Sequence, residues 1–149
     1  MLIDHSTVYA ATFSPDGQRV VTASGNTARV WDAATGKSLS VLTGHSGAVN
    51  LVAVSPDGQR VVTASVDGTA RLWDAATDLS LVVLSGHDGA VNSAAFSPDG
   101  QRVMTASGKT ARLWPILPNG QALIEYAKSI VPRQLTPDQR KQFFLESTD

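Results

Sequence analysis

Histidine, serine and aspartate side chains occur together in the middle of the chain and could support hydrolytic chemistry. His45, Ser65 and Asp67 are the residue types of a triad in which serine attacks a carbonyl, histidine removes its proton and the carboxylate orients the histidine. Such a site needs the serine and histidine within hydrogen-bond distance, which spacing alone does not establish. A hydrolase is therefore one hypothesis, and it predicts that His45→Ala abolishes turnover without unfolding the protein.

Three histidines at regular intervals could also suggest a metal site. His5, His45 and His87 are 40 and 42 residues apart. Ligand nitrogens must converge to about 2.0–2.1 Å from one ion, whereas equivalent positions in successive structural units are displaced from one another. The sequence has no cysteine, which removes thiolate metal sites, cysteine nucleophiles and disulfides. We expect no metal site and no cofactor.

The charge balance argues against nucleic-acid and membrane binding. Twelve Lys and Arg residues against 13 Asp and Glu residues give a formal net charge of −1, with a pI near 6.3. A non-specific binder of nucleic acid or of anionic lipid needs an excess of basic residues. The sequence starts without a signal-peptide pattern and has no apolar run long enough to cross a bilayer. We expect a cytoplasmic protein with no nucleic-acid or membrane partner.

These histidines recur because the sequence itself repeats. The heptapeptide SPDGQRV begins at residues 14, 55 and 97, so its copies are 41 and 42 residues apart. Tryptophans follow at nearly the same interval, and they are Trp31, Trp73 and Trp114. Three units of about 41 residues therefore precede a tail that does not repeat.

Each unit is predicted to form four short strands. In the second unit, apolar residues 49–55 lead into a Ser-Pro-Asp-Gly turn, and residues 60–65 lead into the hairpin signal Asp67-Gly68. Residues 69–73 and 80–84 supply the third and fourth strands. Units of four antiparallel strands that stack on one another are propeller blades. We expect an all-β fold of three four-stranded antiparallel blades, a partial β-propeller, with a short C-terminal helical tail.

The signature pairs Gly44-His45 with Trp73-Asp74, and Gly86-His87 with Trp114, resemble the WD-repeat β-propeller family over roughly residues 1–114. The resemblance implies a partial array of three repeats. It also implies a buried hydrogen-bond chain in each blade, made by a His, a Ser or Thr, an Asp and a Trp. In the second blade these residues are His45, Ser65, Asp67 and Trp73. The other blades keep part of the set, namely His5, Ser24 and Trp31 in the first and His87, Ser107 and Trp114 in the third. The resemblance favours a structural role for these residues over a catalytic one.

We expect a repeat domain of residues 1–116, with blades at about 1–43, 44–85 and 86–116, and a tail of residues 117–149. Asn119 and the capping box at 136–139 predict two short helices in the tail. Helices this short must dock on something. They either cover an exposed end of the blade array or bind a partner through apolar side chains, namely Tyr126, Ile130, Phe143 and Phe144. The tail also resembles segments that follow the propeller in some long bacterial WD-repeat proteins.

Three blades are fewer than the roughly 4–8 that close a propeller. An open array exposes two apolar faces and an unpaired strand edge. Residues 2–5 align with residues 42–45, so the chain is expected to begin within a fourth strand. A homodimer of six blades would cover both faces. The alternative is that the chain is the C-terminal fragment of a larger bacterial multidomain WD-repeat signalling protein.

The favoured function is a non-catalytic scaffold that holds a protein or peptide. Turns before the first strand and between the second and third strands emerge at one end of a blade because antiparallel strands alternate in direction. Turns on a rigid scaffold commonly carry binding residues. The expected partner surface consists of Asn26, Ser46, Val66, Asp88 and Lys109.

Overall fold

The computed structural model describes residues 6–116. In its first sheet, β1 (Val8–Phe13), β2 (Arg19–Ser24), β3 (Thr27–Asp32) and β4 (Ser38–Leu42) are antiparallel neighbours in chain order. Gly17 closes the turn from β1 to β2 with a φ of 70°, a conformation that suits glycine because it has no Cβ. The Ser-Pro-Asp-Gly sequence therefore forms the tight turn that it predicts.

The second sheet repeats this arrangement. It consists of β5 (Val49–Val54), β6 (Arg60–Ser65), β7 (Ala70–Asp74) and β8 (Ser80–Leu84), again in chain order. These bounds agree with the sequence prediction to within one residue. The predicted strand ends are accurate because turn-forming residues precede and follow each of these strands in the sequence.

The third sheet has three strands within the described residues, one fewer than the four expected. It consists of β9 (Ser93–Phe96), β10 (Arg102–Ser107) and β11 (Thr110–Pro115). Pro115 stands where Asp32 and Asp74 begin the next turn in the other sheets. Asp32 and Asp74 donate their N–H groups to the Lys37 and Leu79 carbonyls across this turn, and proline has no N–H to make that bond. The helices predicted for the tail lie outside the described residues, as do Tyr126, Ile130, Phe143 and Phe144.

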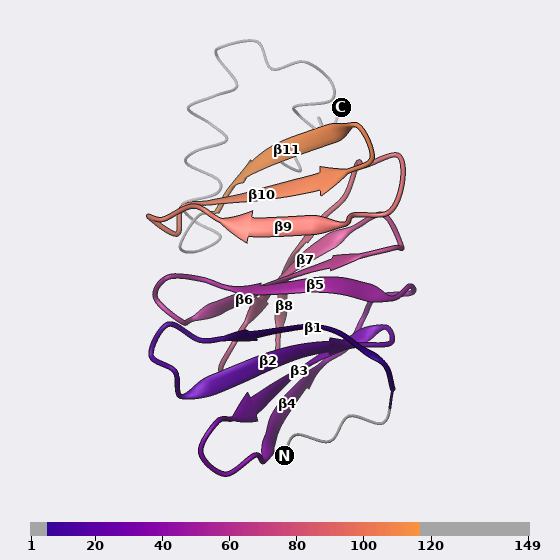
Figure 1. Ribbon diagram of the computed structural model, residues 1–149. Coiled ribbons are helices and arrows are strands. Elements are labelled where there is room, and N and C mark those ends of the chain that lie inside the picture. The colour runs from indigo at the N-terminus through magenta and orange to yellow at the C-terminus, as the bar shows by residue number, and fades with distance from the viewer. Residues whose placement is uncertain (1–5, 117–149) are drawn as a thin grey trace, which may run out of the picture. The chain divides into compact units, whose positions relative to one another are not determined.

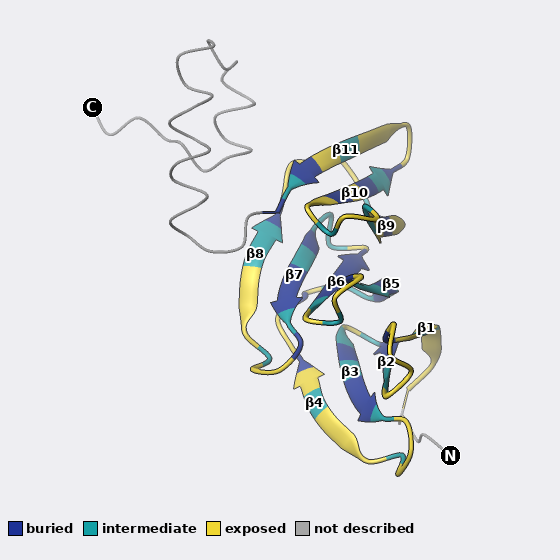
Figure 2. Cartoon of the chain, turned by 90° about the vertical axis from the view of Figure 1, so that its left-hand side faces the viewer, coloured by how far each residue is buried: buried dark blue, intermediate teal, exposed yellow. Residues whose placement is uncertain are grey.

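The three sheets stack face to face, with β1, β5 and β9 next to one another (Figure 1). Val21 and Val30 of the first sheet pack with Val61 and Trp73 of the second in one buried cluster. The outer strands β4 and β8 carry more exposed residues than β3 and β7 (Figure 2). The core therefore lies between sheets.

Backbone hydrogen bonds also join neighbouring sheets. The Val49 N–H donates to the Gly25 carbonyl at 2.8 Å, and the Val91 N–H donates to the Ser65 carbonyl at 2.9 Å. Both acceptors lie in or next to the turn that follows the second strand of a sheet. At both junctions Val49 or its equivalent Val91 therefore bonds to the end of the second strand or to the turn after it, and the acceptor differs by one residue where the turn is longer.

Candidate functional site

A chain of hydrogen bonds crosses the second sheet from its buried tryptophan to its turn. Trp73 Nε1 donates to Thr63 Oγ1 at 2.9 Å, and Thr63 Oγ1 lies 2.7 Å from His45 Nε2. His45 Nδ1 lies 2.8 Å from Asp67 Oδ2. An indole N–H only donates and a carboxylate only accepts. The hydroxyl of Thr63 therefore donates to Nε2, and a neutral His45 donates its Nδ1–H to Asp67.

Burial and hydrogen bonding set the protonation of this His–Asp pair. Burial lowers the pKa of His45, an effect that the bond to Asp67 only partly opposes. Burial alone would raise the pKa of Asp67, but bonds from Thr69 and His45 outweigh it and lower that pKa to about 2. The Ser46 N–H also donates to Asp67 Oδ2 at 3.1 Å. Asp67 therefore remains ionised and ties the turn to the loop before β5.

The third sheet keeps the chain without the carboxylate, and in the first sheet the described residues contain its tryptophan–threonine bond. In the third sheet, Trp114 Nε1 donates to Thr105 Oγ1 at 2.7 Å, and Thr105 Oγ1 lies 2.7 Å from His87 Nε2. His87 Nδ1 lies 3.3 Å from Thr110 Oγ1, as His45 Nδ1 lies 3.4 Å from the equivalent Thr69 Oγ1, but the turn of the third sheet has no aspartate. In the first sheet, Trp31 Nε1 donates to Thr22 Oγ1 at 2.9 Å. His5 lies outside the described residues.

The serines assigned to this chain from the resemblance do not lie in it. Ser65 Oγ donates to the Gly47 carbonyl at 3.0 Å, and Ser107 Oγ donates to the Gly89 carbonyl at 3.0 Å. Ser24 Oγ is buried and has no hydrogen-bond partner among the described residues. The linking hydroxyl belongs to the threonine two residues earlier on the same strand face. The sequence signal was the Thr-Ala-Ser triplet, which occurs in all three units.

The residues expected to form a partner surface lie on turns that contact one another, and we call them the turn surface (Asn26, Ser46, Val66, Asp88 and Lys109). All five are exposed. Asn26 Nδ2 donates to the His45 carbonyl at 3.3 Å, which joins the first turn to the loop that carries Ser46. The Val66 N–H donates to the Ala48 carbonyl at 2.9 Å. These bonds hold the turns of the first two sheets in fixed positions.

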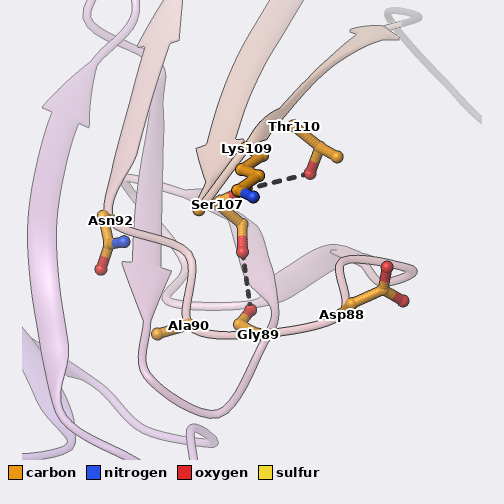
Figure 3. Close-up of a pocket in the computed structure, with 8 residues that line it drawn as sticks. Asp88, Gly89, Ala90, Asn92, Ser107, Lys109 and Thr110 are labelled. Carbon is orange, nitrogen blue, oxygen red and sulfur yellow. Dashed lines mark hydrogen bonds between the residues drawn. The ribbon is translucent and has the colours of Figure 1, made fainter.

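A pocket of about 400 Å³ lies beside the third sheet, between the loop before β9 and the turn after β10. Figure 3 shows Asp88, Asn92, Ser107 and Lys109 around it, with Ser107 donating to the Gly89 carbonyl. The rest of the lining is formed by Gly89, Ala90, Gly108 and Thr110. We call this the end pocket.

Comparison with known proteins identifies the repeat. A family model described as "WD40: WD domain, G-beta repeat" matches residues 1–32, 36–74 and 79–115. The chain belongs to the WD-repeat family. Its three sheets are therefore blades of a partial WD-repeat array.

A solved structure supports the same fold. A chain of the solved "Structure of U3-55K" is similar to this one, with a TM-score of 0.73 and 21% sequence identity. The match covers 76% of this chain and 37% of that chain. At this identity the likeness shows the fold alone. No curated protein matches the sequence.

The WD-repeat blades do not bring a serine nucleophile to a histidine base. Ser65 bonds to a backbone carbonyl, while both ring nitrogens of His45 are engaged by Thr63 and Asp67. The His45 side chain is only 1% exposed. A triad needs a serine in hydrogen-bond contact with the base, so the hydrolase hypothesis gains no support from this geometry.

The tryptophans of the first two blades are covered by arginines. The guanidinium carbon of Arg29 lies 5.3 Å from the ring centre of Trp31, and that of Arg71 lies 5.9 Å from that of Trp73. These are cation–π distances. Within residues 6–116 no group of three His, Asp or Glu side chains could hold a metal ion. No helix in the same range is long and apolar enough to span a bilayer.

Proposed function

We propose that the chain is a non-catalytic scaffold that binds a protein or peptide partner on its turn surface. The observation that carries this proposal is that hydrogen-bonded blades hold five exposed side chains on neighbouring turns. Membership of the WD-repeat family supports the same role. Preformed turns on a rigid scaffold lose little conformational entropy when they bind, which favours recognition.

The test uses random peptides displayed on phage and selected on the wild-type protein. Lys109→Glu changes the turn surface, and Lys37→Glu makes the same charge change on an exposed turn at the other end of a blade. Selected peptides should lose binding to Lys109→Glu or to Val66→Asp and should keep binding to Lys37→Glu. Peptides that bind all four proteins equally would refute the turn surface as the binding site.

We also propose that two copies associate through the outer faces of the first and third blades. Two three-bladed chains supply six blades, which lies within the range of about 4–8 for closed propellers. The exposed apolar side chains Phe13 on the first blade and Leu113 on the third support this proposal. Light scattering after size exclusion should give twice the chain mass of 15.7 kDa. A monomer at all concentrations would refute association.

A further inference from the structure

The outer face of the third blade carries side chains that are buried wherever another blade follows. Met104 is 48% exposed, whereas Val21 and Val62 at the same position of the first two blades are 1% and 0% exposed. Leu113 is 54% exposed, whereas its equivalents, Val30 and Leu72, are buried. The third blade therefore has the apolar face that contacts a following blade.

The first blade shows the complementary pattern. Val8 is 47% exposed, but Val49 and Val91 at the same position of the later blades are fully buried. Phe13 is 66% exposed, and Phe96, its equivalent in the third blade, is partly buried. The first blade therefore has the face that contacts a preceding blade. Terminal repeats that end an array in water commonly carry a polar outer face, whereas these blades expose Phe13, Met104 and Leu113 there.

The end pocket corresponds to the place where a following blade is held. The two junctions inside the chain use the Gly25 and Ser65 carbonyls, which accept from Val49 and Val91 N–H. Asn50 Nδ2 adds a bond to the Val91 carbonyl at 3.4 Å. The turn of the third blade has the length of the first, so Gly108 is the equivalent of Gly25, and Asn92 is the equivalent of Asn50. Both Gly108 and Asn92 line the end pocket. The pocket thus has the hydrogen-bonding groups that receive the first residue of an inner strand.

We propose that the end pocket receives Val8 of a second copy of this chain, in the register used between blades within the chain. The Val8 N–H of one copy donates to the Gly108 carbonyl of the other, while Phe13 lies against the face that carries Met104. The interface is head to tail, so a pair of chains forms two of them and closes. This inference rests on the proposed association and adds which faces meet and how.

The test compares two aspartate variants with their mixture. Phe13→Asp alters only the first-blade face and Met104→Asp only the third-blade face, and both positions are exposed, so each variant should fold with an unchanged far-UV spectrum. In a pair of identical variants, both interfaces contain an aspartate, so each variant alone should appear as a monomer of 15.7 kDa. In an equimolar mixture, the intact third blade of Phe13→Asp can receive the intact first blade of Met104→Asp. The doubled mass should therefore return in the mixture.

The matched control is Leu79→Asp, which replaces another exposed apolar residue outside both end faces and should keep the doubled mass. A wild-type dimer whose variants are not rescued by mixing would overturn the head-to-tail register but leave association standing. A wild-type monomer would overturn both. Asp88 and Lys109 line the end pocket and also belong to the turn surface, whereas Val66 does not line the pocket. Loss of peptide binding in Val66→Asp therefore tests the turn surface independently of association.

Discussion

Replacing Thr63 with valine removes the hydroxyl that joins Trp73 to His45 while keeping a β-branched side chain of similar size. The substitution eliminates hydrogen bonds of 2.9 Å and 2.7 Å. It leaves the indole N–H and the His45 Nε2 without that partner in the interior of the second blade. Each buried polar group without a partner costs about 1–3 kcal/mol, so the expected loss is about 2–6 kcal/mol. The free energy of unfolding of domains of this size is roughly 5–15 kcal/mol, so a loss of this size is easily measured.

Urea unfolding followed by tryptophan fluorescence and far-UV circular dichroism measures this loss. Ser24→Ala is the matched control, because that hydroxyl is buried without a partner among the described residues. Its free energy of unfolding should not fall, because the substitution removes a buried hydroxyl that makes no hydrogen bond among the described residues. Ser65→Ala should lie between the two, since the Ser65 hydroxyl bonds to the Gly47 carbonyl and the Asp67 N–H, both of which are backbone groups. A loss for Thr63→Val that is smaller than the loss for Ser65→Ala would refute the chain drawn through Thr63.

Two further predictions concern the turn that carries Asp67. The pKa of Asp67 falls from its ordinary 3.8 to about 2 on folding. The ionised carboxylate therefore adds roughly 2 kcal/mol to the free energy of unfolding above pH 4. That contribution should disappear as pH falls through about 2. When the free energy of unfolding is plotted against pH, the Asp67→Asn variant should therefore fall less steeply than the wild type between pH 4 and pH 2. An added Cβ on Gly47 would lie 2.9 Å from the Asp67 backbone nitrogen, whereas one on Gly89 would meet nothing nearer than 3.8 Å. Gly47→Ala should therefore destabilise the protein by about 1–3 kcal/mol in urea, and Gly89→Ala should not; equal losses would contradict the close approach at Gly47.

The strands could be predicted from the sequence because local chemistry determines them. Tight-turn sequences bound β6 on both sides, and the repeat carries the same assignment into the first and third units. The departure at Pro115 was also visible in the sequence as a broken pattern.

The linking hydroxyl could not be chosen from the sequence. Thr63 and Ser65 are two residues apart, so both face the same side of β6. Trp73 pairs with Val61 in the register of β6 and β7, which brings its indole toward Thr63 rather than toward Ser65. Which of the two hydroxyls accepts the indole N–H therefore depends on that register and on the length of the indole ring. The stacking of Arg29 and Arg71 on tryptophans was missed for the same reason, since it depends on side-chain direction.

The second blade differs from its neighbours by one added residue, and that residue links stability to the turn surface. The turn Val66-Asp67-Gly68 is one residue longer than the corresponding turns of the first and third blades. The longer turn brings Asp67 to His45 and to the Ser46 N–H. It also leaves Val66 exposed, as the apolar member of the turn surface. The carboxylate that completes the buried hydrogen-bond chain therefore also fixes the backbone on both sides of Val66 and Ser46. A partner that recognises an apolar side chain on this surface would find it on the turn that Asp67 holds to the loop before β5.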